Sequence, residues 1–584
     1  MEDTTVNDNE PKVKKQKKES DESGAVYPPI FGPGHALDYN LFQLSNTPLT
    51  EAHQQKALEQ LEVYLKAQQE TFLGYQLNEN VHYSKKLSFM LDIHTNNIGD
   101  PFVNGNCTVN TKIMERAVLD YFARLWHAPT PSTPENKESY WGYVLSMGST
   151  EGNLYALYNA RDYLKGKALY KEPNSDLTFV RPMKANLHSK NAFHPIAFFS
   201  QDTHYSITKI VRALEIRTFY EIGEREYKGQ CPITSDGHWP KEVPSENGNE
   251  GPGSVDVDKL IQLVEFFARS GSPPLIILNI GTTFKGAYDN VEQVGHRLKP
   301  ILEKYNLYER KVEHAPDKYD IRTGYWIHVD GALGASYLPF LEKARHRILI
   351  KEHIPKFDFS LPFIHSIVTS AHKYPGCPMP GGIYMTKHKY QIKPPDDPEY
   401  IGSPDTTFAG SRNAISPAAL WCYYANTSDE IEIAKAIKVE ETAKYAETKL
   451  KELERNYHRY GYKLWVERTP LAITIRFRDP SNPNNKDPNT KDPVVLKYSL
   501  SQMEIKVDGE NAPRKYVHIF IMQSVTKKII DDLVHDLANA YDQNLLSKQE
   551  NVGDQSVSVS STTENPHIHR VTHVPLDKRG YSGN

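Results

Sequence analysis

The chain has 584 residues, more than a single compact core usually organises, which predicts a large domain with smaller lobes and tails. Apolar residues make up 39% of the chain and charged residues 24%, and the formal net charge is −4; these values favour a soluble globular protein and give no reason to expect binding to nucleic acid. Because the chain has no apolar run of about 18 residues and its start, Met1-Glu2-Asp3, is acidic, we expect neither a membrane span nor a secretory signal peptide.

The four cysteines lie far apart, at Cys107, Cys231, Cys377 and Cys422. Their spacing matches neither a disulfide framework nor a zinc site. We therefore expect no metal, and a reducing compartment, the cytoplasm, as the location.

Both ends of the chain are polar. Residues 1–25 hold five lysines between Lys12 and Lys18, followed by acidic residues. A solvated, disordered tail is the favoured interpretation, with a nuclear-import or nucleic-acid patch as the alternative. Residues 547–584 are rich in Ser, Thr and Asn, which predicts a second disordered tail.

Helical and strand patterns alternate between the tails. An N-terminal helical segment is expected over 26–110, where apolar residues recur at helical spacing from 56 to 72, and a stronger helical pattern follows at 112–127. Short apolar runs at 196–199, 275–278, 325–329, 364–368 and 383–385 are typical of buried strands, and helical stretches separate several of them. This order predicts an α/β large domain, residues 111–410, with a mostly parallel sheet.

The pattern changes after Ser411. A long charged helix at 429–457, strands at 472–477 and 516–522, and a final helix at about 526–545 predict a smaller C-terminal α+β domain, residues 411–546. Four stretches rich in Pro, Asn, Lys or Gly, near 165–192, 229–256, 306–322 and 480–515, are predicted to be surface insertions.

Two predicted strands end in residues that can carry chemistry. His328-Val329-Asp330-Gly331-Ala332 closes one, and Ser370-Ala371-His372-Lys373 closes the other. Ligands of open α/β sheets bind at the carboxyl ends of the strands, so Asp330 and Lys373 are candidates for a single site. Considered alone, neither residue indicates a site. An Asp at the end of a strand is often only a turn residue, and a single Lys usually lies on the solvated surface.

A third motif is typical of anion binding. Ser146-Met147-Gly148-Ser149-Thr150-Glu151-Gly152-Asn153 precedes a helical pattern, and small residues at a helix start leave backbone N–H groups free for a phosphate. Ser149 and Thr150 add hydroxyl donors. The lysine of a P-loop is missing, which argues against nucleoside triphosphates. Alone the motif is commonly a helix cap, but together with Asp330 and Lys373 it favours one shared site.

These motifs belong to a longer ordered set. It comprises 96–102 (NNIGDPF), 120–126 (DYFARLW), 141–143 (WGY), 148–153, 202–206 (DTHYS), 279–283 (NIGTT) with Gly286-Ala287, 328–332, 370–373, 376–380 (GCPMP) and 407–413 (TFAGSRN). The set resembles group II pyridoxal 5′-phosphate (PLP)-dependent amino-acid decarboxylases, most closely the PLP-type histidine decarboxylases and the plant serine decarboxylases. The resemblance implies a fold type I, PLP-dependent transferase-like large domain, a carboxy-lyase activity in amine biosynthesis, and a homodimer.

The resemblance also implies roles for individual residues. Lys373 would carry PLP as an imine, and Asp330 would pair with the pyridine nitrogen, so that the ring accepts the electrons released as CO2 leaves. Ala332 and His204 would lie on opposite faces of the ring. The phosphate would be held by Ser149, Thr150, Ser370 and His372, while Thr282 or Thr283 would lie near the polar substituents of the ring. The alternative for His204 is a hydrogen-bonded loop histidine.

Tyr400 occupies the place of the mobile-loop tyrosine that returns a proton in aromatic amino-acid decarboxylases. Its phenol is a plausible general acid if a lid excludes water, and a tyrosine packed at a domain junction is the alternative. Two positions depart from the familiar pattern, Gly331 where many group II members have Ala and Ser149 where they have Gly or Cys. Neither change removes a required functional group.

Other functions compete with this one. Sphingosine-phosphate lyase shares the Asp and His-Lys motifs and would make the protein a carbon–carbon lyase, but the segments around 96–102 and 410–413 favour the decarboxylase. Aminotransferases usually bind the substrate carboxylate with an arginine, and Arg412 could equally be structural. A non-enzymatic interaction protein would not need this combination of residues. For the substrate, histidine is the first expectation, and serine or an aromatic amino acid the next.

Overall fold

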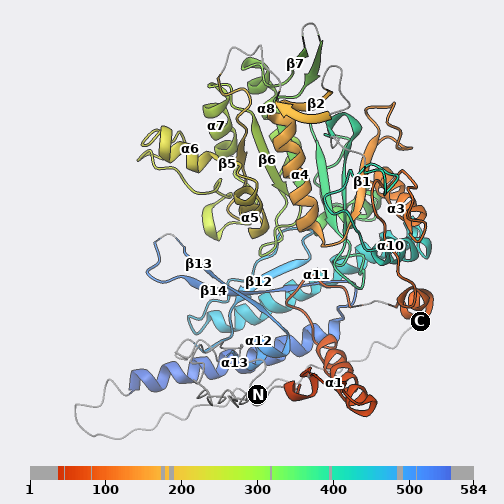
Figure 1. Cartoon of the computed structure of the whole chain (residues 1–584). Coiled ribbons are helices and arrows are strands. Elements are labelled where there is room, and N and C mark those ends of the chain that lie inside the picture. Colours follow the sequence, from red (N-terminus) through yellow and green to blue (C-terminus); the bar gives the residue numbers. More distant parts are fainter. Residues whose placement is uncertain are drawn as a thin grey trace, which may run out of the picture.

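A computed structural model describes residues 37–44, 46–79, 82–171, 178–182, 190–315, 318–392, 398–482, 491–507 and 509–553 (Figure 1). The lysine cluster of the N-terminal tail lies outside the described residues. None of the described helices is both long enough and apolar enough to cross a membrane.

A seven-stranded sheet forms the centre of the large domain. Its strands lie in the order β1 (Tyr140–Leu145), β11 (Gly382–Lys387), β10 (Ser366–Ser370), β9 (Trp326–Asp330), β6 (Pro274–Asn279), β4 (Ile196–Phe198) and β5 (Arg217–Thr218). β10, β9, β6, β4 and β5 pair in parallel, while β11 runs antiparallel to both of its neighbours. The predicted α/β fold with a mostly parallel sheet is therefore confirmed, and each of the five predicted strands is present.

Helices cover both faces of this sheet, so alternate side chains of each strand enter different apolar layers. In β1, Trp141 and Tyr143 pack in the layer of α4 (Ser149–Leu164) and α5 (Tyr205–Ala213). Tyr140 and Val144 pack on the other side, with α3 (Lys112–Leu125), α7 (Val257–Ala268), α8 (Val291–Lys304) and α10 (Ile415–Ala425). This packing on both faces fixes the ends of the strands, and with them the residues of the candidate site.

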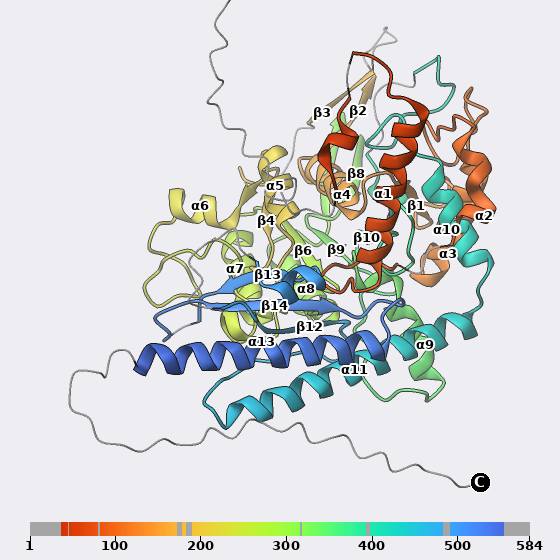
Figure 2. The ribbon, with the colours of Figure 1, turned by 90° about the horizontal axis from the view of Figure 1, so that it is seen from below.

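The C-terminal part of the chain is built around a smaller sheet. Its three strands lie in the order β12 (Thr474–Arg478), β14 (Arg514–Phe520) and β13 (Ser501–Ile505), all antiparallel. The long helices α11 (Asp429–His458) and α13 (Lys527–Gly553) lie side by side below it (Figure 2), and the short α12 (Pro493–Lys497) contacts α13. Because α13 continues to Gly553, residues 547–553 are helical, although we expected the tail to begin at 547.

The remaining helices are α1 (Glu51–Gln69), α2 (Ser84–Leu87), α6 (Phe219–Glu226) and α9 (Leu338–His346), and 3-10 turns lie at Tyr39–Phe42, Ser88–Leu91, Gly248–Glu250, Gly334–Ser336 and His388–Tyr390. The first predicted helix thus begins five residues earlier than its apolar pattern. Thr50 caps it by accepting the N–H of His53.

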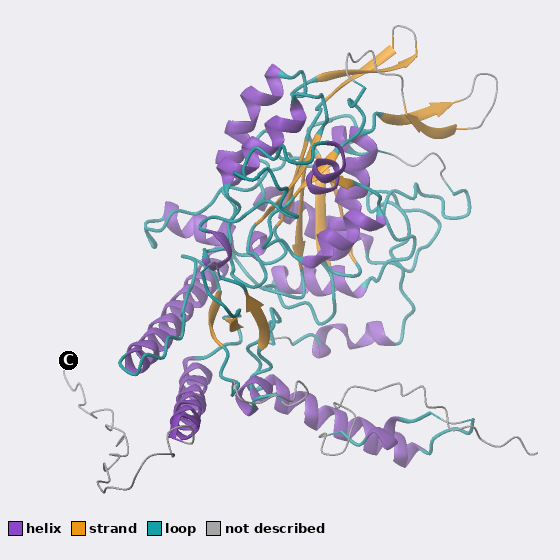
Figure 3. Cartoon of the chain, turned by 90° about the vertical axis from the view of Figure 1, so that its left-hand side faces the viewer, coloured by secondary structure: helices purple, strands orange, loops and turns teal. Residues whose placement is uncertain are grey.

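The four stretches expected to be surface insertions have different structures. Two contain β-hairpins, β2 (Lys167–Lys171) with β3 (Thr178–Pro182) and β7 (Arg310–Ala315) with β8 (Lys318–Arg322), which project from one end of the large domain (Figure 3). The stretch 480–515 supplies α12 and β13 to the small domain. The stretch 229–256 contacts that domain, because Asn249 Nδ2 donates to the Lys506 carbonyl at 2.9 Å and Glu250 pairs with Arg514.

Candidate active site

Asp330 is the last residue of β9 and lies buried at the carboxyl end of the central sheet. One carboxylate oxygen accepts the amide N–H of Asn153 on α4 at 2.8 Å, and the other accepts the backbone N–H of Ala332 at 3.2 Å. Both bonds fix the orientation of the carboxylate. A buried charge held by donors in this way can pair with a cationic group of a ligand.

Asn153 is itself fixed by a chain of polar contacts that reaches back into the sheet. Its oxygen lies 2.8 Å from His328 Nε2, and His328 Nδ1 lies 2.8 Å from the Ser366 hydroxyl. Burial lowers the pKa of His328 to about 4, so the ring is neutral at pH 7. Since Asn153 donates to Asp330, its oxygen is the acceptor for His328 Nε2–H. Ser366, His328 and Asn153 therefore form a support for Asp330.

Lys373 follows β10, the parallel neighbour of β9, and lies close to Asp330. The two strands are in register through Val368 and Asp330, and the Ser370 N–H donates to the Ala332 carbonyl at 3.1 Å. Burial lowers the pKa of Lys373 to about 8, although the carboxylate of Asp330 opposes this shift. A lysine in such surroundings has a substantial neutral fraction near pH 7 and can act as a nucleophile.

His204 is the third member of the group and caps α5, since its Nδ1 accepts the Ser206 N–H. Its ring nitrogen Nδ1 also lies 2.8 Å from the Ser206 hydroxyl. Burial lowers the pKa of His204, Asp330 opposes this shift, and Lys373 adds to it. The three side chains thus act on one another electrostatically, as residues of one site do.

The start of α4 lies against the end of β10, the strand that Lys373 follows. The hydroxyls of Ser149 and Ser370 are 2.9 Å apart, and Thr150, which is partly buried, follows in the first turn. Gly148 has φ +71°, and a Cβ added to it would lie 2.8 Å from Cε1 of His372. Hydroxyls, N–H groups of a helix start and a close approach of backbone to His372 suit the phosphate of a cofactor.

The predicted ring-contact residues lie on loops around this group. Ala332 follows Asp330 and is partly buried. Thr282 is buried, and its hydroxyl accepts the Ala287 N–H at 2.9 Å, so it holds its own loop together. Thr283 is partly exposed, which makes it the better placed of the two threonines to contact a bound molecule.

Tyr400 is not brought to the other predicted residues within this chain. Its side chain is 80% exposed, and its phenol makes no hydrogen bond with the described residues. The backbone around it is anchored, since Asn106 Nδ2 donates to the Tyr400 carbonyl and the Asn106 N–H donates to the Ile401 carbonyl. The backbone of this loop is thus fixed by Asn106, while the phenol of Tyr400 is exposed.

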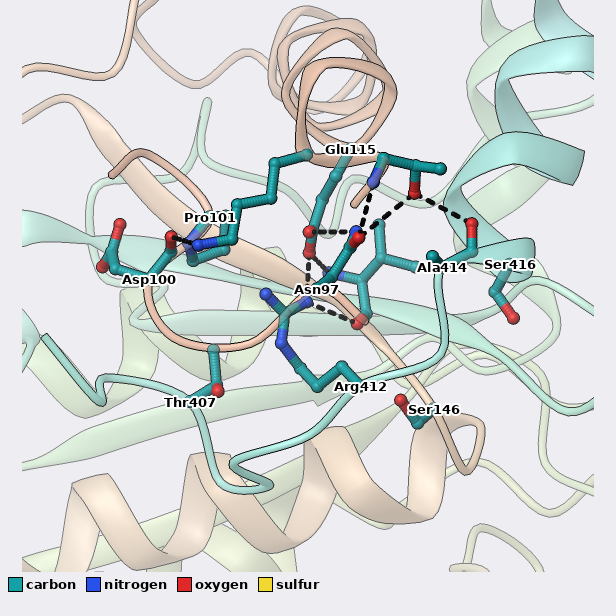
Figure 4. Close-up of polar contacts among 12 residues, drawn as sticks. Asn97, Asp100, Pro101, Glu115, Ser146, Thr407, Arg412, Ala414 and Ser416 are labelled. Atoms are coloured by element: carbon teal, nitrogen blue, oxygen red, sulfur yellow. Dashed lines mark hydrogen bonds and ion pairs between the residues drawn. The ribbon is translucent and has the colours of Figure 1, made fainter. Parts of the chain in front are cut away.

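Arg412 has a structural position rather than one that faces a substrate (Figure 4). Its guanidinium pairs with Glu115, both side chains being fully buried, and donates to the carbonyls of Gly99 and Val144. Asn97 donates to the second oxygen of Glu115 at 2.9 Å. This network ties the segments before α3 and before α10 to β1, and so explains why the 96–102 and 407–413 motifs occur together.

Two residues of the site were missed as functional in the sequence, Asn153 and His328. Both lie inside motifs that were recognised, but nothing in their spacing shows that they contact each other across 175 residues. One feature of the sequence could have indicated their role. Asn153 and His328 are polar residues at positions where the helix and strand patterns predict burial.

Comparison with known proteins agrees with the geometry. A model of the pyridoxal-dependent decarboxylase conserved domain matches residues 50–411. A histidine decarboxylase of Mesorhizobium japonicum is 27% identical over 84% of this chain and 99% of its own length, and serine decarboxylase 3 of Oryza sativa is 30% identical over 80% and 78%. The crystal structure of L-methionine decarboxylase from Streptomyces sp. 590 has 43% identity and a TM-score of 0.78, covering 87% of this chain and 98% of that one.

The family model spans well over half of the chain, and the residues at the carboxyl ends of β9 and β10 fit its cofactor. The chain belongs to the pyridoxal-dependent decarboxylases and is a PLP-dependent carboxy-lyase of fold type I.

Proposed function

We propose that this protein decarboxylates L-methionine to 3-methylthiopropylamine and CO2. The observation that carries the choice of substrate is the 43% identity with L-methionine decarboxylase across 98% of that chain, against 27–31% with the histidine and serine decarboxylases. Histidine, the first expectation from the sequence, and serine or an aromatic amino acid remain predictions. The substrate experiment described below tests them together with methionine.

PLP, when bound, supplies a ring that takes up the electrons left on the substrate carbon as CO2 departs. We propose that Asp330 pairs with the pyridine nitrogen and keeps it protonated. Its support by Asn153 and Ala332 favours this role, because both donors stabilise the ionised carboxylate that a pyridinium needs as partner.

Lys373 is proposed to attach the cofactor covalently. With a pKa of about 8, roughly a tenth of this lysine is neutral at pH 7, whereas an ordinary lysine is almost wholly charged. Burial therefore leaves part of the amine neutral, the form that would bond to the cofactor aldehyde, and the nearby Asp330 keeps the shift of its pKa moderate.

The remaining predicted residues would bind the cofactor without reacting. Ser149 and Thr150 begin α4, and Ser370 and His372 lie close to this helix start. These four residues would hold the phosphate. His204 and Ala332 would lie against the two faces of the ring, and Thr283 would contact its polar substituents. The low pKa of His204 supports the stacking role, since a neutral imidazole can lie against a ring without carrying a buried charge.

Tyr400 is proposed as the acid that protonates the substrate carbon after CO2 has left. Because its phenol is exposed in the isolated chain, this role requires either closure of the loop or assembly of two chains. We propose the second, a homodimer in which the exposed loop of one copy completes the site of the other.

The decisive experiment is to incubate the purified enzyme with PLP and each of the twenty amino acids, and to measure CO2 and amine. Release of 3-methylthiopropylamine from methionine, with no other amine at a comparable rate, is the expected result. Histamine, ethanolamine or tryptamine as the main product would reject methionine as the substrate.

A cofactor control separates binding from turnover. The enzyme should show a visible absorbance band from its bound PLP, and Lys373→Ala should lose that band while keeping its circular dichroism spectrum. An enzyme that retains the band after this substitution would refute the assignment of Lys373.

A further inference from the structure

A groove of about 580 Å³ lies on the large domain, at the end of the central sheet opposite to Asp330 and Lys373. It is formed where α4 and α5 end and where the parallel strands β4 and β5 begin. The 16 residues of α4 span about 24 Å, from Ser149 at the candidate cofactor site to Leu164 beside the groove. The groove is therefore separate from the site proposed for PLP.

The lining of this groove is strongly basic. Of its twelve residues, five are arginine or lysine and two are glutamate: Arg161, Lys165, Arg212, Arg217 and Arg225, with Glu215 and Glu221. The five cations come from α4 and the residue after it, from α5, from β5 and from α6. The fold brings them together, because no run of basic residues in the sequence contains them.

Two of the five cations have no counter-charge in the part of the chain that the structure describes. The three others pair with Asp162 or with Glu226. Lys165 and Arg212 form neither an ion pair nor a side-chain hydrogen bond with any described residue. Two positive charges at the groove are thus available to an anion.

The ends of the helices offer another explanation for these cations, since a helix dipole favours positive charge at its carboxyl end even without a ligand. Arg161 and Arg212 do lie in the last turns of α4 and α5. However, burial lowers the pKa of Lys165, and the neighbouring Arg161 and Lys167 lower it further. Cations are therefore crowded around Lys165, and an anion bound there would relieve their repulsion.

Apolar side chains line the same groove. Val211, Ile216 and Ile222 contribute to its wall and are otherwise packed in the protein, each being less than a tenth exposed. An inorganic anion would leave this apolar wall in water. A ligand that carries both an apolar ring and anionic groups would use the wall and the cations together.

We propose that this groove binds a small organic phosphate, with its phosphate groups at Lys165 and Arg212 and its ring against the apolar wall. Phosphate is the favoured anion because a guanidinium group binds it through paired, charge-assisted hydrogen bonds. The volume of the groove lies within the range of small-molecule sites, about 300–1,000 Å³. This binding is independent of the amino acid on which the enzyme acts.

The test titrates the PLP-loaded enzyme with ADP by calorimetry, and with pyrophosphate and adenosine as the two parts of that probe. ADP should bind more tightly than either part, and its Kd should rise with the salt concentration, as expected for exposed charges. The absence of ADP binding, or equal affinities for ADP and pyrophosphate, would overturn an organic phosphate as the ligand.

Charge reversal locates the binding. Lys165→Glu combined with Arg212→Glu should raise the Kd for ADP at least tenfold, because attraction to two cations becomes repulsion. The control is Lys438→Glu combined with Arg455→Glu on α11, which makes the same change in net charge at two exposed positions, one of them also in the last turn of a helix. Equal weakening by both pairs would show that ADP responds only to the overall charge, and the groove would be rejected.

The absorbance band of bound PLP separates the groove from the cofactor site. ADP at the groove should leave PLP bound, so the band should persist throughout the titration. Release of PLP by ADP would show that ADP competes for the cofactor site, and the inference would be wrong. Arg212→Gln, a single change at an exposed residue, should raise the Kd severalfold and provides the same test if the reversed pair does not fold.

Discussion

At the scale of single residues, the support behind Asp330 is open to a direct test. Asn153→Leu removes one of the two hydrogen bonds to a buried carboxylate, and a bond to a charged group contributes about 1.5–3 kcal/mol. If that bond orients Asp330 for the pyridine nitrogen, the Kd for PLP should rise at least tenfold in an absorbance titration of the apoenzyme.

A matched control for this substitution lies on the same helix. Asn159 is also buried on α4, but it bonds to the Tyr390 carbonyl and the Ile392 N–H, away from Asp330. Asn159→Leu should lower the melting temperature and leave the Kd for PLP unchanged. Equal effects of both variants on PLP binding would show that Asn153 only stabilises the fold.

The lowered pKa of Lys373 predicts how cofactor capture depends on pH. Only the neutral amine attacks an aldehyde, and burial lowers its pKa to about 8. The rate of PLP capture by the apoenzyme should rise about tenfold per pH unit below this value and level off above it, as followed by stopped-flow absorbance. A rate that keeps rising to the ordinary lysine pKa would show that the amine is not buried before PLP binds.

At the scale of elements, apolar runs with turn residues beside them were enough to locate five strands of the central sheet. The pattern failed for β1, where Tyr140–Leu145 is aromatic on both faces because α4 and α3 cover it from opposite sides. It also failed for the hairpins β2–β3 and β7–β8, whose polar sequences have the composition of loops. The composition of a short segment does not show whether a second strand lies beside it to pair with it.

Motif positions likewise predicted part of the candidate site. Asp330, Lys373 and Ser149 could be assigned to one place because parallel strands end at one edge of the sheet. The support from Asn153 and His328 could not, since it depends on how α4 lies over β9.

The turn before α4 gives a prediction about an element. Gly148 needs a positive φ that other residues adopt only with strain, and a Cβ there would press on His372. Gly148→Ala should therefore weaken PLP binding about tenfold or more by shifting the phosphate seat, as measured by the same titration. Gly461→Ala is the control, because Gly461 also has a positive φ but a Cβ added there would meet nothing within 4 Å.

At the scale of the whole molecule, α1 exposes part of the apolar stripe that predicted it as a helix. Leu58 is 61% exposed and Leu65 55%, whereas Ala57 of the same helix is buried. Helical periodicity predicts that such a stripe is covered, but it does not say whether the cover comes from the same chain or from a second copy. The stripe and the exposed phenol of Tyr400 both agree with the proposed homodimer.

Subunit complementation tests the dimer and the role of Tyr400 together. Lys373→Ala and Tyr400→Phe should each be nearly inactive alone. If Tyr400 of one copy serves the Lys373 site of the other, a mixed dimer contains one site in which both residues are intact. Co-refolding equal amounts should then restore about one quarter of the wild-type activity, because half of the dimers are mixed and each has one complete site. If Tyr400 acts within its own chain, no mixed site is complete and the mixture should stay as inactive as its components.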